Sequence, residues 1–209
     1  MKIISLSGKA GAGKDTAADI IEGILGKSQV NRCAFANKLK EVCKEVFDLS
    51  DAQVYGHLKE EPLDQPVLFT RALQKVVLSS FGLHGHYPSY SHLKEFKTPR
   101  EIMQYVGTEF LRSFDSEVHL RNLPLSPTKW NIVTDARFKN EIDYLHARSA
   151  SSHYTYLALF IDRDDVADVP SHSSEGLTRE STHATVIDNN GSLDDLESAI
   201  TEVLNEWLR

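Results

Sequence analysis

The sequence lacks the marks of several large protein classes. Its two cysteines, Cys33 and Cys43, have neither the number nor the spacing of a disulfide framework or a metal site. No apolar run approaches the roughly 18 residues of a membrane span, and a strand-like segment begins at Lys2, so we expect no signal peptide. The nine histidines show no metal-ligand spacing, and no Gly-x-Ser-x-Gly nucleophile motif occurs. We therefore expect a reduced, cytoplasmic protein without a membrane partner.

Positive charge is also scarce. The 209 residues include 23 lysines and arginines against 30 acidic residues, which gives a formal net charge of −7. This balance argues against a general nucleic-acid-binding surface, although a local group of cations can still bind a small anion. The length suits one sizeable domain with inserts. We therefore expect small-molecule partners and no nucleic acid.

The most informative motif follows an apolar strand expected over residues 2–7. Residues 8–16 read GKAGAGKDT, which has the spacing of a phosphate-binding loop: a Gly, four residues, then Gly-Lys. Its glycines let successive N–H groups point at an anion, and the helix expected over 14–26 adds its positive N-terminal end. The pattern predicts a nucleotide site formed by Gly8, Gly11, Ala12, Gly13, Lys14, Asp15 and Thr16.

The end of this loop departs from the common motif. Lys14 supplies a mobile charge for the outer phosphates of a nucleotide such as ATP. The next residue is Asp15, where the common motif has Ser or Thr to hold Mg²⁺, and Thr16 follows. Either Thr16 reaches the metal or Asp15 acts on it, directly or through water. A Gly-Lys-x-Thr ending is typical of small-molecule kinases of the nucleoside-monophosphate type.

Strand and helix patterns alternate along the remaining chain. Further strands are expected at 32–36, 130–134, 156–161 and 184–187, and further helices at 37–47, 69–81, 98–114, 138–150 and 193–208. Asp51 is expected to cap a short helix, and 82–97 to form a long loop. The alternation predicts an α/β fold of the phosphate-loop type: three layers, with a parallel sheet between helices and ligands at the carboxyl ends of the strands.

A second motif follows the strand expected at 130–134. Asp135 stands at its carboxyl end, and Arg137 and Glu141 are four residues apart on the next helix. Asp135 could accept a hydrogen bond from metal-bound water or from a phosphoryl acceptor, Arg137 could clamp a phosphate, and Glu141 could orient Arg137. An N-cap with a surface ion pair would explain the same residues, but the nearby phosphate loop favours a catalytic interpretation.

Other polar groups fit the same chemistry. Arg100 begins a helix, where a cation is often balanced by an anionic partner, and Lys38 is a second candidate for the acceptor phosphate. Asn189 and Asn190 follow the last strand, where their amides could read adenine or simply form a turn. We expect a closing lid at about 163–180, with Arg163 or Arg179 reaching the transferred group.

With these motifs assembled, the chain resembles the deoxynucleoside monophosphate kinases of tailed bacteriophages. The resemblance includes the loop at 8–16, IMQYVGTE at 102–109, TDAR at 134–137 with Glu141, the segment at 172–177, and VIDNNGSL at 186–193. An Asp after the loop lysine is normal in this family. Residues 48–97 match poorly, and these are expected to carry much of the base recognition.

The resemblance implies Mg²⁺-dependent transfer of the γ-phosphoryl of ATP to a deoxynucleoside monophosphate. It implies a single kinase domain over 1–209, with a core at about 1–47 and 128–209 and an acceptor-binding insert at about 48–127. It also implies acceptor binding by Arg100, Asp135, Arg137 and Glu141, and enzymes of this family are often homodimers. Some members of the family have an aromatic residue that stacks on the base, and in this chain it is replaced near His119, which is a candidate substrate-binding residue.

Other interpretations stay open. Phosphomevalonate kinases share the Gly-Lys-Asp loop and the Asp-x-Arg at the strand end, and dephospho-coenzyme A kinase shares an Asn-Asn-Gly-like loop. Residues 103–109 favour the phage-type enzyme. A protein of another class, a regulator that binds ATP without phosphorylating a small molecule, would not need Arg100 and Arg137.

Overall fold

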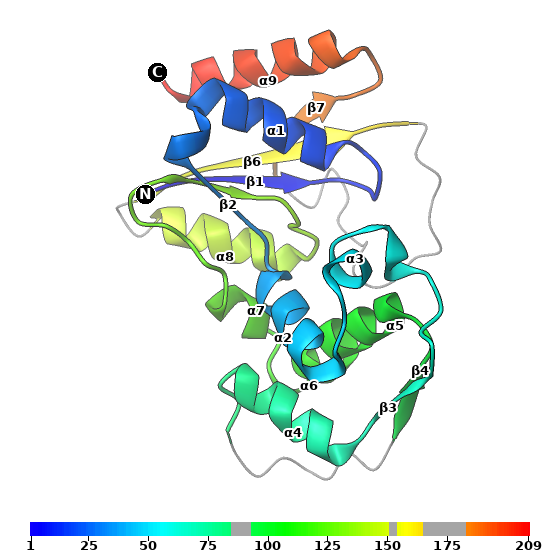
Figure 1. Ribbon diagram of the computed structural model, residues 1–209. Coiled ribbons are helices and arrows are strands. Elements are labelled where there is room, and N and C mark those ends of the chain that lie inside the picture. Colours follow the sequence, from blue (N-terminus) through cyan, green and yellow to red (C-terminus); the bar gives the residue numbers. More distant parts are fainter. Residues whose placement is uncertain (85–92, 151–153, 165–182) are drawn as a thin grey trace. The chain divides into compact units, whose positions relative to one another are not determined.

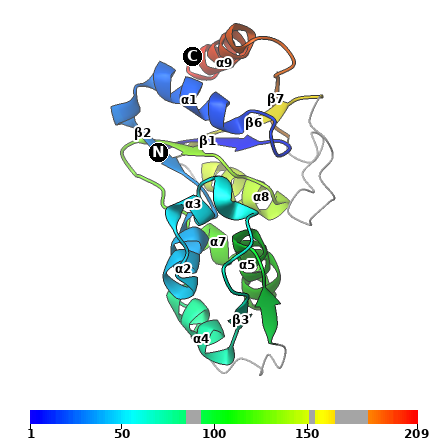
Figure 2. The same cartoon turned by 45° about the vertical axis from the view of Figure 1, so that its right-hand side comes forward.

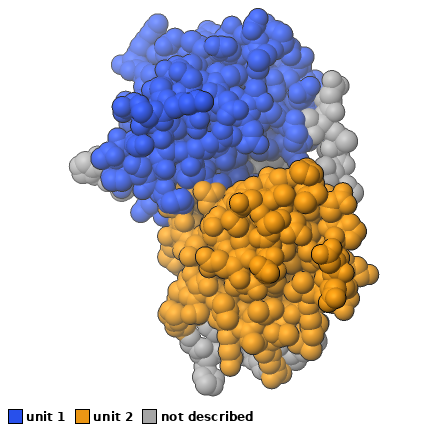
Figure 3. Space-filling model, viewed as in Figure 1, with its two compact units in different colours: residues 1–34, 124–209 blue, residues 35–123 orange. Residues whose placement is uncertain are grey.

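The computed structural model describes residues 1–84, 93–150, 154–164 and 183–209. The chain forms two compact units, shown in different colours in Figure 3. Unit 1 combines residues 1–34 with 124–209, and unit 2 is the continuous stretch 35–123. Unit 2 begins at residue 35 because the helix that follows residue 36 contributes its buried residues to this unit, and the core and insert bounds expected from the sequence stay a prediction.

Unit 1 is built on a five-stranded sheet in which every strand pair is parallel. In spatial order its strands are β2 (Val30–Cys33), β5 (Trp130–Val133), β1 (Lys2–Ser7), β6 (Thr155–Asp162) and β7 (Thr185–Asp188). β1 is central: Ile4 stands between Ile132 of β5 and Leu157 of β6. Because the strands run the same way, the loops after them share one edge of the sheet.

Helices cover both faces of this sheet (Figures 1 and 2), which confirms the expected α/β architecture. On one face, α1 (Lys14–Leu25) and α9 (Leu193–Trp207) bury their apolar sides in one cluster with Ile4 and Leu6. Side chains alternate along a strand, so Ser5 points to the other face, where its hydroxyl bonds Tyr156. There α8 (Lys139–Ala150) packs on β6, and His146 meets the Tyr156 ring edge-on.

Unit 2 surrounds a separate apolar core rich in phenylalanine. Its helices are α2 (Asn37–Phe47), α3 (Asp51–Val54), α4 (Arg71–Ser80), α5 (Pro99–Gln104), α6 (Leu111–Phe114) and α7 (Val118–Arg121). A short 3-10 helix, η1 (Lys27–Gln29), belongs to unit 1, and η2 (His57–Lys59) to unit 2. The antiparallel pair β3 (Val67–Phe69) and β4 (Lys94–Phe96) was not expected, because three-residue strands are too short to show an alternating pattern.

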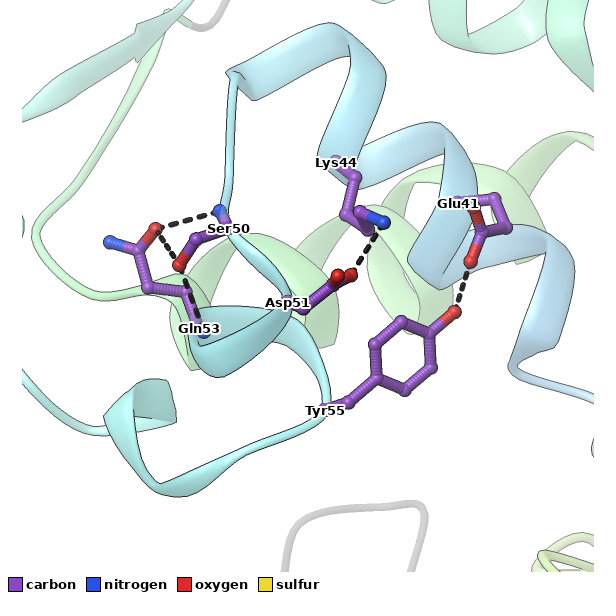
Figure 4. A network of polar contacts seen from close by, with 6 residues as sticks. All are labelled: Glu41, Lys44, Ser50, Asp51, Gln53 and Tyr55. Atoms are coloured by element: carbon purple, nitrogen blue, oxygen red, sulfur yellow. Dashed lines mark hydrogen bonds and ion pairs between the residues drawn. The ribbon is translucent and has the colours of Figure 1, made fainter.

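The connection between α2 and α3 is held by polar contacts (Figure 4). The Ser50 hydroxyl accepts from the Gln53 backbone N–H, and the Gln53 side chain accepts from the Ser50 N–H, which forms a capping box. Asp51, the expected cap, is instead the first helical residue and pairs with Lys44. The cap prediction was therefore wrong by one residue.

The helix expected to run on to residue 114 contains a π-helical segment, η3 (Tyr105–Phe110), between α5 and α6. Gly107 lies in it, and a Cβ there would stand 2.4 Å from a methyl group of Leu39 in α2. The bare backbone therefore allows a close helix contact, and π-helical turns of this kind occur often at functional sites. Among the described residues, no helix is long and apolar enough to cross a membrane.

Candidate functional site

The loop between β1 and α1 uses backbone conformations that require glycine. Gly8 has φ +135° and Gly13 has φ +94°. A Cβ on Gly8 would lie 2.3 Å from the carbonyl oxygen of Ile161 in β6, and one on Gly13 would lie 2.4 Å from the amide nitrogen of Asn189. The Gly8 approach is to a backbone atom and leaves no room for a Cβ, while a Cβ on Gly13 would force the Asn189 side chain to shift. The glycines therefore let the loop rest directly on β6 and on the turn after β7.

Lys14 is the first residue of α1, and its ammonium group reaches back over the loop. Nζ donates to the carbonyl oxygens of Gly8 at 2.8 Å and Lys9 at 2.6 Å. The Ala12 N–H also donates to Lys9, which closes a tight turn within the loop. A cation and a helix N-terminus thus meet at one place, which is the electrostatic requirement for binding phosphate groups.

Asp15 is directed to the edge strand β2. Arg32 donates through Nη2 to Asp15 Oδ1 at 2.7 Å and through Nη1 to Asp19 Oδ1 at 2.6 Å. Arg32 was not among the site residues predicted from the sequence. The four-residue spacing of Asp15 and Asp19 on one side of α1 is a signal that could have indicated a shared cation.

The groups beside Lys14 suit a hard divalent cation in their chemistry. Thr16 is an exposed residue with a hydroxyl group, and the Asp15 side chain is 90% exposed despite the bond to Arg32. Hydroxyl and carboxylate oxygens are ligands that Mg²⁺ accepts, alone or through water, together with phosphate oxygens. These side chains therefore fit a magnesium ion that is shared with a nucleotide.

Asn189 and Asn190 bind the backbone of neighbouring loops. Asn189 Nδ2 donates to the carbonyl oxygen of Ala12 at 2.8 Å, so the amide expected to read adenine fastens the phosphate loop. Asn190 Oδ1 accepts from the Asp164 N–H at 2.9 Å, and its Nδ2 donates to Asp188. The turn after β7 thereby ties the phosphate loop to the chain that leaves β6.

Asp135 stands just beyond β5, half-buried, as its place after the strand predicted. Burial, together with a smaller contribution from the nearby Asp135 charge, raises the pKa of the Cys33 thiol to about 12. Cys33 is consequently a neutral thiol at physiological pH. Its closeness also shows that the Asp135 carboxylate lies at the ends of β2 and β5, the edge where ligands of a parallel sheet bind.

Glu141 is buried, with 2% of its surface exposed, and holds the segment before α8. Its Oε2 accepts from the backbone N–H of Arg137 at 2.8 Å and of Phe138 at 3.1 Å. Glu141 thus contacts the Arg137 backbone, and its role in orienting the Arg137 side chain stays a prediction. The Arg137 side chain is exposed, while the backbone that carries it is held by the buried Glu141.

Three predicted substrate residues belong to unit 2. Arg100, in the first turn of α5, pairs with Glu60. His119 is 5% exposed, lies edge-on to Phe81, and places Nε2 2.8 Å from the Gly107 carbonyl oxygen. Lys38 is half-buried in the first turn of α2. His119 therefore packs within unit 2 in this structure, and its part in substrate binding stays a prediction.

The expected lid lies largely outside the described residues. Arg163 is exposed directly after β6. Arg179 and the motif at 172–177 fall in the stretch 165–182, of which the structure gives no description. The roles of both lid arginines remain predictions from the sequence.

Together, the parallel sheet and the glycine-dependent loop with its lysine define a phosphate-loop α/β protein of the nucleoside-monophosphate-kinase type. No family model matches the chain. The chain is 30% identical over 219 residues to the "Putative deoxynucleotide monophosphate kinase" of Acanthamoeba polyphaga mimivirus, and the match covers 96% of this chain and 94% of the relative. The chain belongs to the deoxynucleotide monophosphate kinase-like family. The tailed-phage origin suggested by the motifs stays a prediction.

Proposed function

We propose that the protein transfers the γ-phosphoryl group of ATP to a deoxynucleoside monophosphate, giving ADP and the deoxynucleoside diphosphate. The family relationship supports a nucleotide kinase. The observation that carries the donor half of the proposal is the loop of unit 1, where the Lys14 ammonium meets the N-terminus of α1. Phosphoryl transfer mainly needs positioning and positive charge, and this arrangement supplies both.

On the donor side, the loop N–H groups and Lys14 bind the β- and γ-phosphates. Thr16, with Asp15 or Asp135, would hold Mg²⁺, which when bound supplies positive charge to the phosphate oxygens. On the acceptor side, Arg137 neutralises the acceptor phosphate so that its oxygen can approach the γ-phosphorus. Glu141 positions Arg137 for this role, because its carboxylate accepts a hydrogen bond from the Arg137 backbone N–H.

Arg137→Ala is expected to lower kcat/KM for the acceptor by about 100-fold, because one donor to a developing charge is lost. The Kd for ATP should change less than about threefold, since Arg137 serves the acceptor. Steady-state kinetics and calorimetric titration with ATP measure the two effects. Arg148→Ala, near the other end of α8, removes the same charge and should behave as wild type. An equal loss of ATP affinity and turnover would place Arg137 on the donor side.

The reaction is tested by measuring ADP release from Mg-ATP with each deoxynucleoside monophosphate, the matching ribonucleotides and phosphomevalonate offered separately. Activity with at least one deoxynucleotide is expected, and the panel then reveals the preferred base and the role of the 2′-hydroxyl. Activity with phosphomevalonate alone would contradict the proposal in favour of another kinase. ATP binding without any transfer would favour a regulatory protein instead.

A further inference from the structure

Among the described residues, Arg32 forms two ion pairs that join the edge strand β2 to the acidic side of α1. One guanidinium bridges two carboxylates, Asp15 and Asp19, with separate nitrogens at 2.7 and 2.6 Å. The planar guanidinium has several N–H donors in fixed directions, so it can bridge two carboxylates. A lysine ammonium, which acts as a point charge, is less suited to this geometry. Arg32 is not one of the residues that bind ATP, Mg²⁺ or the acceptor in the proposed reaction.

The place of Asp15 makes this bridge significant. Asp15 follows Lys14 directly in the first turn of α1, so a carboxylate lies next to the residue whose ammonium group is expected to meet the nucleotide phosphates. An uncompensated carboxylate there would repel a triphosphate, and it would also repel Asp19, which is one helical turn away. Arg32 places a positive charge on this pair at the end of α1 that faces the loop.

We propose that Arg32 is a positioning residue for the phosphate loop: it holds the Asp15 carboxylate at β2 and offsets its charge, so that a nucleoside triphosphate can bind beside Lys14. The proposal rests on the proposed function only in assuming that ATP occupies the loop. Arg32 acts through Asp15 and need not touch the nucleotide. The effect of Arg32 should therefore depend on the Asp15 charge and on Mg²⁺.

Calorimetric titration with ATP, in EDTA and in excess MgCl₂, tests this inference. Arg32→Ala should raise the Kd for ATP in EDTA by about tenfold, because the Asp15 charge is no longer offset. In MgCl₂ the increase should be smaller, since the cation screens the carboxylate from the phosphates. Adding Asp15→Asn to Arg32→Ala should restore the affinity in EDTA. Arg148→Ala is the matched control and should bind as wild type.

Two results would overturn the inference: ATP affinity in Arg32→Ala equal to that of wild type, or no recovery when Asp15→Asn is added. A role limited to folding would give the second result, because removing another ion-pair partner does not repair a fold. If Arg32→Ala does not fold, Arg32→Gln takes its place in the same comparisons. A wild-type chain that binds ATP but phosphorylates no nucleotide contradicts only the proposed function, and one that binds no ATP overturns both.

Discussion

Lys14→Ala is expected to reduce kcat for phosphoryl transfer by about 10²–10³-fold. The Lys14 ammonium lies over the loop, bonded to the carbonyl oxygens of Gly8 and Lys9, and is placed to exchange these for phosphate oxygens. Removing one such electrostatic contact to a transition state costs about 3–4 kcal/mol. The measurement is the turnover of Mg-ATP with the deoxynucleotide that the wild-type enzyme prefers.

The control is Lys27→Ala, which makes the same change of charge at an exposed position beyond the C-terminal end of α1. It should leave turnover within about twofold of wild type, as expected for surface substitutions away from a site. Turnover like that of wild type in Lys14→Ala would defeat the assignment of this loop as the ATP site.

Gly8→Ala should destabilise unit 1 by about 2 kcal/mol or more, because a side chain at φ +135° is strained. The added Cβ would also meet the Ile161 carbonyl oxygen at 2.3 Å, and a backbone atom within a sheet cannot easily move away. The free energy of unfolding in urea measures this loss. Both tryptophans of the chain, Trp130 and Trp207, lie in unit 1 with their rings 5.7 Å apart, so their fluorescence reports on this unit.

Gly23→Ala is the matched control, since it makes the same substitution within α1, where an added Cβ meets nothing within 4 Å. It should raise the free energy of unfolding by about 0.5–1 kcal/mol, because alanine is the better helix former. If Gly8→Ala were as stable as wild type, the loop would have to adjust to the added side chain. That result would contradict the tight fit of Gly8 against β6.

Much of the fold follows from the sequence where local patterns are strong. β1 and α2 begin and end at the predicted residues, because a buried central strand and an amphipathic helix each have a clear period. β2 forms at residues 30–33, earlier than predicted, because pairing with β5 decides the strand and leaves residue 34 outside it. The η3 segment was not predicted, because a π-helical turn leaves the apolar pattern of the surrounding helix unbroken.

The candidate site was predictable in its residue types but not in its contacts. The glycines and Lys14 are recognised from spacing alone. Asn189 meets Ala12 across 177 positions of sequence, and Arg32 meets Asp15 across 17, so both contacts depend on the strand order. Glu141 was placed near Arg137 by helical spacing, but only the structure shows that it accepts from backbone N–H groups.

The position of β1 in the sheet bears on how the chain folds while it is being synthesised. β1 is made before the other strands of its sheet, and both strands that flank it, β5 and β6, come more than a hundred residues later. Unit 2 is one uninterrupted stretch and can complete its own core as soon as residue 123 has left the ribosome. The phosphate loop gains its contact with Asn189 even later, after the turn that follows β7 has been made. The strand and loop that are translated before the rest of the sheet are thus among the last parts of unit 1 to gain all their native contacts.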